Sequence, residues 1–233
     1  MRNAMTGWVT LLIAFSLFLL VYSSCRSNGV EPAADAREYR LEQRTHSFPR
    51  GSKKYEGTVA VFPDGREVEH GPWTTWYQSG GKCQQGEMWF GKDHGMRRGW
   101  WSSGVPLFES LYEKGSQVGR FREWDEGGNL IHESIPTIDA VWLVTSWWPN
   151  GLKRECGAYR KVSVEGSDEL TPIGRHQWWD SEGQVTKVGE YNNAGNKIGI
   201  WWEYAENGAV VSQKEYNNKG ELIREEKRSH EEE

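Results

Sequence analysis

Short runs of alternating aromatic and polar residues, each bounded by glycine, recur along the middle of the chain. The runs Gly71–Gly80, Gly95–Gly104 and Gly119–Gly128 begin 24 residues apart. In each run one glycine comes first, another follows nine positions later, and an aromatic residue stands five positions after the first. Alternation between glycine turns is typical of β-strands, and repetition at a fixed period indicates a repeat architecture. The pattern therefore predicts a row of similar β-sheet units.

The second half of each unit also recurs, as a short strand that ends in a polar Gly/Asn turn. Examples are Gly86–Gly95, Gly189–Gly199 and Lys214–Gly220. One unit is therefore predicted to be a β-hairpin of about 24 residues with a turn at each end. A lone hairpin is marginally stable in water, so each unit is expected to need its neighbours.

Two segments carry a resemblance to a known family. Gly71–Gly80 (Gly-x-Trp-x-x-Trp-Tyr-x-x-Gly) and Gly86–Gly95 (Gly-Glu-x-x-x-Gly-Lys-x-His-Gly) resemble MORN repeats, and more narrowly the bacterial variant in proteins described as antitoxins. The resemblance implies an all-β fold, an elongated and twisted antiparallel sheet of stacked hairpins. The array is expected to span residues 54–220, as about six units after an N-terminal cap. It departs from the pattern at Trp142, which stands where an opening glycine is expected, and at an insertion over Val162–Thr171.

The repeat positions divide the aromatic residues into two groups. The glycines that mark the units are Gly71, Gly80, Gly95, Gly104, Gly119, Gly128, Gly151, Gly174, Gly183, Gly199 and Gly208. Every unit is aromatic five positions after its opening glycine, at Trp76, Trp100, Trp124, Trp147, Trp179 and Tyr204. Such regularity predicts an inward-facing structural row.

Aromatic residues at positions expected to face solvent are candidates for binding. They are Tyr77, Trp101, Trp148, Trp178 and Trp202. Exposed aromatic residues gathered on one sheet face would form a binding surface. The alternative is that sheet curvature covers them or that they stack on one another across strands. Alternation is less regular two and three positions after the opening glycine, which leaves open whether a bulge exchanges the faces there.

The N-terminus has the pattern of a targeting segment over residues 1–25. An apolar run from Trp8 to Tyr22 is short for a membrane span and suits a secretory signal. Ser23-Ser24-Cys25 resembles the lipobox of bacterial lipoproteins, which implies that Cys25 is lipidated. An uncleaved N-terminal anchor and ordinary cleavage are the alternatives, and all three predict export. Residues 26–53 are predicted to be a polar linker, and residues 221–233 a charged tail whose first residues extend the last strand.

The composition favours a binding protein over an enzyme. The chain has 14 Trp and 27 Gly but a hydrophobic fraction of 36%, so its interior must be built from aromatic residues. A net charge of −5 argues against a nucleic-acid partner. The six histidines lack metal-ligand spacing, and no nucleophile or phosphate-loop motif occurs. Cys83 and Cys156 lie three units apart, about 30 Å, too far for a disulfide. No catalytic residue, metal or cofactor is predicted.

The sequence leaves three functions open. The leading hypothesis is an envelope-anchored, non-enzymatic scaffold that binds a protein or peptide through its aromatic sheet face or an edge. The family resemblance implies a second, an antitoxin-like protein that neutralises a toxin. The third is a module that binds envelope glycans or choline-type head groups. The 24-residue period counts against this hypothesis, because Trp-rich modules of that class have shorter repeats.

The lipobox resemblance makes a direct prediction. Expressed in a bacterial host, the protein is expected to reach the membrane fraction with an acylated mature chain that begins at Cys25. The Cys25→Ala variant is expected to lose the acyl mass. Intact mass spectrometry of both proteins checks this, and a full-length, unmodified wild-type chain in the soluble fraction would contradict export.

Overall fold

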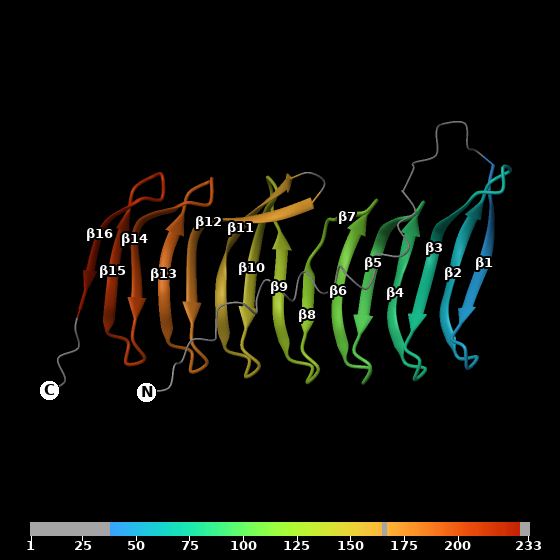
Figure 1. The fold of residues 1–233 in the computed structure, drawn as a ribbon, viewed down its shortest axis with the longest axis horizontal. Coiled ribbons are helices and arrows are strands. Elements are labelled where there is room, and N and C mark those ends of the chain that lie inside the picture. Colours follow the sequence, from blue (N-terminus) through green and yellow to red (C-terminus); the bar gives the residue numbers. More distant parts are fainter. Residues whose placement is uncertain (1–37, 165–166, 229–233) are drawn as a thin grey trace.

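The computed structural model describes residues 38–164 and 167–228. In these residues the protein is all-β, with 16 strands in one open antiparallel sheet and no helix (Figure 1). Neighbours in the sheet follow one another in sequence, except that the short β7 pairs beside β6. The strands are β1 (Arg40–Ser47), β2 (Lys53–Val61), β3 (Glu67–Trp76), β4 (Lys82–Trp89), β5 (Lys92–Trp100), β6 (Pro106–Glu113), β7 (Ser116–Gln117), β8 (Phe121–Trp124), β9 (Leu130–Pro136), β10 (Val141–Trp147), β11 (Lys153–Val164), β12 (Ser167–Trp179), β13 (Val185–Tyr191), β14 (Lys197–Tyr204), β15 (Val210–Tyr216) and β16 (Leu222–Lys227). This confirms the predicted fold class.

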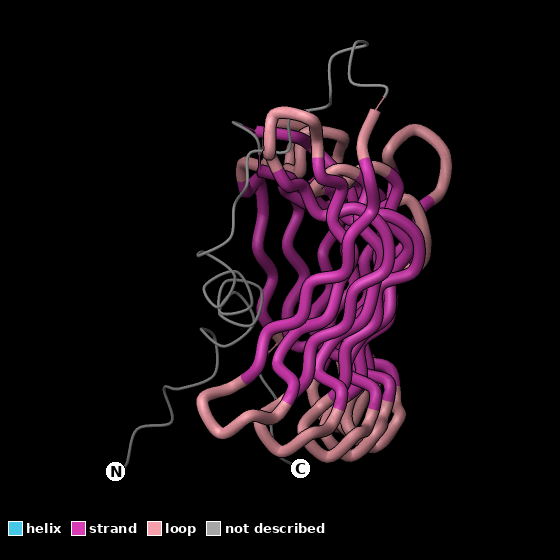
Figure 2. The backbone as a smooth tube through the Cα atoms, turned by 90° about the vertical axis from the view of Figure 1, so that its right-hand side faces the viewer, coloured by secondary structure: helices cyan, strands magenta, loops and turns pink. Residues whose placement is uncertain are grey.

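The strands form a single layer. Seen along the row of strands, they lie one behind another, and no second sheet of described residues packs against them (Figure 2). A single layer cannot bury its apolar residues between two sheets, so its side chains must pack along the sheet surface itself.

Glycines set the turns at the hairpin ends. In the turn after β3 the Tyr77 amide donates to the Gly81 carbonyl at 2.8 Å, and the Gly80 amide donates to the Tyr77 carbonyl at 2.9 Å. Gly80 has φ 95°, a left-handed conformation that glycine adopts without steric cost. The equivalent Gly104 has φ 89° and the same two hydrogen bonds. The closing glycine of the sequence pattern is therefore the left-handed residue of each turn.

The opening glycine lies in a bulge within the strand. Gln85 pairs with Arg98 and Glu87 with His94, so one residue of β4, Gly86, faces three residues of β5. Gly95, the first of those three, has φ 67°. The bulge needs a left-handed residue, which explains why a glycine recurs at this position.

Rings pack directly over glycines of the adjacent strand. Trp201 is 2% exposed and His176 is 1% exposed. A Cβ atom built on Gly189 would lie 2.1 Å from the Trp201 ring, and one on Gly157 would lie 2.2 Å from the His176 ring. The missing side chain makes the space that each ring fills, so the sheet buries these aromatic residues without a second layer.

The array extends beyond the predicted boundaries. Residues 26–53 were expected to be a linker, but Arg40–Ser47 forms β1. It pairs with β2 along its length, and Gln43 Nε2 donates to Thr58 Oγ1 at 3.0 Å. Backbone pairing holds this polar strand although it has little apolar periodicity. The start of the tail, expected to extend the last strand, forms a separate strand, β16, which pairs antiparallel with β15.

Three further features of the sequence can be placed in the structure. The insertion lengthens the hairpin of β11 and β12, seen as two long strands in Figure 1. Trp142 replaces the opening glycine of its unit and is buried. Cys83 and Cys156 are free thiols. Cys25 lies outside the described residues.

Substitution of a glycine that lies beneath an aromatic ring tests this packing. Gly189→Ala places a methyl group inside the Trp201 ring and is expected to lower the free energy of unfolding by about 1–3 kcal/mol. Gly81→Ala is the control, because its Cβ would meet no atom closer than 3.9 Å and its φ is not left-handed. Urea denaturation of both variants checks the difference, and equal stability would contradict the ring-over-glycine packing.

Candidate binding surface

The two faces of the sheet carry different residues. The residue two positions after each opening glycine lies on one side, here called the aromatic face: Trp73, Arg97, Phe121, Val144, His176 and Trp201. Side chains alternate along a strand, so residues one, three and five positions after the glycine lie on the opposite face. A register shift precedes the fifth position: Thr75 of β3 pairs with Gln84 of β4, and the next residue, Trp76, pairs with Lys82. The extra residue, Cys83, is in β4, so the alternation of side chains along β3 is unchanged.

The buried row is not the expected one. Within the repeat pattern, buried rings stand two positions after the opening glycine, as Trp73, His176 and Trp201 do. The aromatic residues five positions after it are half-buried on the opposite face, namely Trp76, Trp100, Trp124, Trp147, Trp179 and Tyr204. The difference arises because the bulge at the opening glycine lays the second residue, and not the fifth, over the neighbouring strand.

Three candidate binding aromatics connect one unit to the next. Tyr77 Oη donates to the Trp100 carbonyl at 2.7 Å, and Trp101 Nε1 donates to the Trp124 carbonyl at 3.0 Å. Trp148 Nε1 donates to the Trp179 carbonyl at 3.1 Å. All three were expected to face solvent but are half-buried, because each ring lies against the turn of the following unit.

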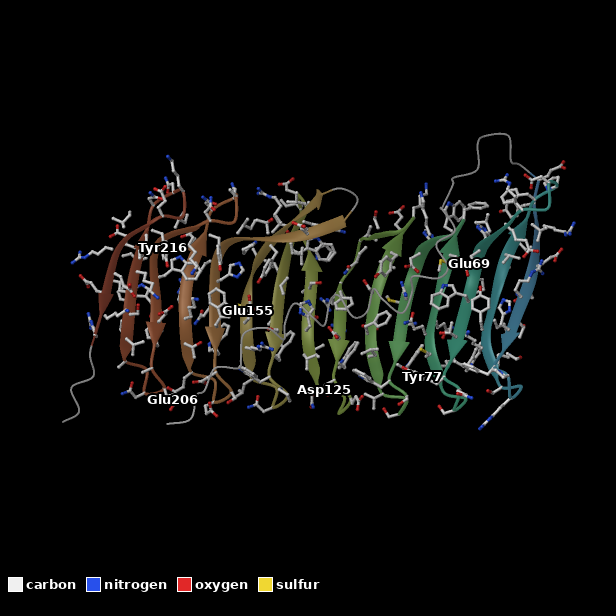
Figure 3. The ribbon with its side chains drawn as sticks, in the orientation of Figure 1. Glu69, Tyr77, Asp125, Glu155, Glu206 and Tyr216 are labelled. Carbon is white, nitrogen blue, oxygen red and sulfur yellow. The ribbon has the colours of Figure 1, made fainter. Side chains whose placement is uncertain are left out.

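Asp125 takes the place of these rings in the third unit. It accepts a hydrogen bond from the Asn129 amide at 2.8 Å. Tyr77 and Asp125 lie at the same end of their hairpins (Figure 3). The position thus serves the turn, whether it carries a ring or a carboxylate.

Trp178 and Trp202, the other two candidates, are half-buried on opposite faces. Trp178 is on the aromatic face, where it stacks at 5.6 Å on His176. Trp202 is next to the buried Trp201 in β14 and so points the other way. The five candidates therefore do not form one patch.

The structure instead gathers aromatic and basic residues at the C-terminal end of the aromatic face. This lysine–tryptophan platform consists of Trp178, Lys187, Tyr191, Lys197, Trp201, Lys214 and Tyr216, from β12 to β15. The Trp201 ring is at its centre, with centroids 5.8 Å from Trp178, 4.9 Å from Tyr191 and 6.3 Å from Tyr216. Tyr216 is labelled at the upper end of its strand in Figure 3.

Lysines lie over the platform rings. Lys187 Nζ is 5.4 Å from the Trp178 centroid and 5.3 Å from that of Trp201. Lys197 Nζ is 4.7 Å from the Trp201 centroid and 5.4 Å from that of Tyr216. Such cation–π contacts stabilise an ammonium group at a partly buried site by about 0.5–2 kcal/mol.

The ammonium groups also repel one another. Burial lowers the pKa of Lys197, and the nearby charges of Lys187 and Lys214 lower it further. Lys214 differs, because it donates to Glu203 at 3.1 Å and this hydrogen bond raises its pKa. The platform therefore holds one paired and two unpaired lysines.

An open hollow of about 540 Å³ adjoins the platform. It is lined by Glu203, Val211, Ser212, Lys214, Glu225, Lys227 and Arg228. Ser212 is 6% exposed, and its hydroxyl has no hydrogen-bond partner among the described residues. The hollow continues the polar part of the platform to the edge of the sheet.

A half-buried carboxylate lies on the other side of the platform. Tyr159 Oη donates to Glu155 Oε1 at 2.6 Å, and His176 Nδ1 lies 3.8 Å from the same oxygen. Burial alone raises the pKa of Glu155, but the neighbouring His176 and Tyr159 outweigh it and hold this pKa below its ordinary value. Figure 3 shows Glu155 at mid-height of the sheet, beside the platform strands. Glu155 lies beside His176, which stacks on Trp178 and whose Nε2 is hydrogen-bonded to the Ala158 carbonyl at 2.9 Å.

The described residues contain no group of His, Cys, Asp and Glu side chains that could hold a metal ion. In the same part of the chain no helix is long and apolar enough to cross a membrane.

No protein-family model and no curated protein sequence matches this chain. A solved structure described as "Crystal Structure of TarM" is similar over 51% of this chain, with 15% identity and a TM-score of 0.28. The match spans about a fifth of that protein, 21% of its length. A similarity at this level carries no argument about fold or function.

Sequence reasoning missed Lys187, Lys197 and Lys214. The missed signal for Lys197 was its repeat position. Lys197 stands two residues before the opening glycine Gly199, and the bulge places it beside the ring of Trp201, two residues after that glycine. Asp93 and Arg97 occupy the same two positions in the second unit. Lys187 and Lys214 are found only from cross-strand register, which pairs them with Trp178 and Trp201.

Removal of the Tyr159 hydroxyl tests the interactions of the Glu155 carboxylate. Because the pKa of Glu155 is lowered on folding, its stabilisation is present above the unfolded-state pKa of about 4.3 and is lost as pH falls through the folded-state pKa. Tyr159→Phe is expected to lower the free energy of unfolding by about 1 kcal/mol at neutral pH. The loss should shrink as pH falls through the folded-state pKa, below which the carboxyl is protonated in both states. Urea denaturation at neutral pH and over a series of acidic pH values checks this, and a pH-independent loss would contradict the assignment.

Proposed function

We propose that this chain is a non-enzymatic repeat scaffold of the cell envelope that binds a protein partner through its aromatic face. The observation that carries the proposal is the lysine–tryptophan platform, where the buried Trp201, three half-buried rings and ammonium groups from four strands meet on a face that no described element covers. Tryptophan and tyrosine are enriched among the energetically important residues of protein interfaces. The placement in the envelope rests on the Ser23-Ser24-Cys25 pattern.

The rings of the platform are poor sites for a quaternary amine. A choline-type head group needs an open aromatic face. Here the faces of Trp178, Trp201 and Tyr216 already lie under Lys187 and Lys197. The contacts therefore favour a macromolecular partner over such a head group. An antitoxin-like role would be a special case of this function, in which the partner is a toxin.

The face is also a better binding surface than the edge strands. β1 and β16 end the sheet and each has one unpaired edge. Both carry alternating charges, such as Arg40, Glu42 and Arg44 on β1, which form ion pairs with one another. Charged edge strands are a common means of preventing strand addition.

Site-specific cross-linking compares the two faces directly. A photoreactive p-benzoylphenylalanine replaces Tyr216 on the aromatic face or Tyr204 on the opposite face, both half-buried tyrosines. On illumination of cells that express the full-length protein natively, the Tyr216 variant is expected to form a covalent adduct with another protein and the Tyr204 variant is not. Adducts at neither position, or equally at both, would contradict the proposed function.

A further inference from the structure

The cations on the two halves of the aromatic face differ in whether a carboxylate pairs with them. In the second unit the Arg97 guanidinium lies over Trp73 and Phe108, and Asp93 pairs with it at 2.7 Å. In the last unit Lys197, at the repeat position that Asp93 occupies in the second, lies over Trp201 and Tyr216. No carboxylate of the described residues is within ion-pair distance of Lys197 or Lys187. Arg97 therefore has an ion-pair partner within the chain, whereas Lys187 and Lys197 have none among the described residues.

The lysines of the platform also repel one another. The nearby charges of Lys187 and Lys214 act against the protonated form of Lys197, and the charge of Glu203 offsets this only in part. The aromatic rings hold the ammonium groups in place despite this repulsion. An anion placed among them would relieve the repulsion and would meet side chains that are already ordered, so little conformational entropy would be lost on binding.

We propose that the lysine–tryptophan platform binds an acidic peptide segment of a partner protein, with its carboxylates on Lys187 and Lys197. The inference rests on the proposed function and names the chemistry of the partner. The adjoining hollow adds Lys227 and Arg228, which extend the basic strip toward the edge of the sheet.

The surrounding charges favour a peptide over a long polyanion. The whole chain carries a net charge of −5, which repels nucleic acids and anionic membranes. Glu203 and Glu225 stand among the lysines and flank Lys214 at 3.1 and 3.8 Å. These carboxylates would oppose a uniformly charged polymer but leave room for carboxylates spaced along a peptide.

Calorimetric titration of the full-length protein tests the proposal. The probe is a short synthetic peptide of alternating glutamate and phenylalanine, and the control peptide has glutamine in place of glutamate. The acidic peptide is expected to bind at low salt and to weaken as salt is raised, because the contacts are between charges. Lys187→Gln and Lys197→Gln are each expected to weaken binding about tenfold, a loss of about 1.4 kcal/mol.

Lys153→Gln is the matched control variant. Lys153 Nζ lies 5.9 Å from the Trp179 centroid, so it is also a lysine over a tryptophan, but on the opposite face. Binding by this variant is expected to equal that of the wild type. Circular dichroism confirms that each variant is folded before titration.

Several results would overturn the proposal. These are no binding of the acidic peptide at low salt, equal binding of the glutamine peptide, or unchanged affinity in Lys197→Gln. Tighter binding of polyphosphate or of anionic lipid vesicles would assign the platform to a polyanion. Binding that appears only after removal of Glu231–Glu233 would assign it to the chain's own acidic end. If a protein cross-links at Tyr216 while the acidic peptide does not bind, this inference falls and the proposed function stands.

Discussion

The packing of aromatic rings onto glycines is the interaction on which this sheet depends. A single layer of strands has no opposing sheet, so a large side chain is buried only if it lies against the sheet itself. The Trp201 ring does so because Gly189 leaves room beneath it, and His176 does so over Gly157. This explains why a chain with a hydrophobic fraction of only 36% contains 14 Trp and 27 Gly. Each ring needs its glycine, and each glycine would leave a gap without its ring.

The same packing requires the bulges. An unbroken ladder would project the ring away from the sheet, whereas the left-handed Gly95 and its equivalents lay the following residues across the neighbouring strand. Polar ring atoms then connect successive units, as the Trp148 indole does with the Trp179 carbonyl. Stability is therefore shared between adjacent units, as in other repeat proteins, and the lysines over the C-terminal rings are held by a framework that exists before any partner binds.

The sequence was sufficient for the fold because glycine spacing directly reports turns and hairpin length. It was insufficient for the faces, because a bulge changes which side chain is covered without changing the spacing. The second-position residues Trp73 and Trp201 therefore looked ambiguous but are buried. β1 was missed because backbone pairing, with little apolar periodicity, holds it in the sheet. The platform was missed because Lys187 and Lys214 meet their tryptophans through cross-strand register, which depends on the same bulges.

Two adjacent tryptophans in β14 offer the most direct measurement. Trp201 and Trp202 differ by one position, yet Trp201 lies over Gly189, at 2% exposed, and Trp202 lies on the opposite face. Hydrogen exchange of the two indole N–H groups, followed by NMR with single Trp→Phe variants for assignment, compares them within one strand. Ring-over-glycine packing predicts strong protection of the Trp201 indole and fast exchange of the Trp202 indole. Equal exchange, or greater protection of Trp202, would contradict the assignment of the aromatic face and the packing that forms it.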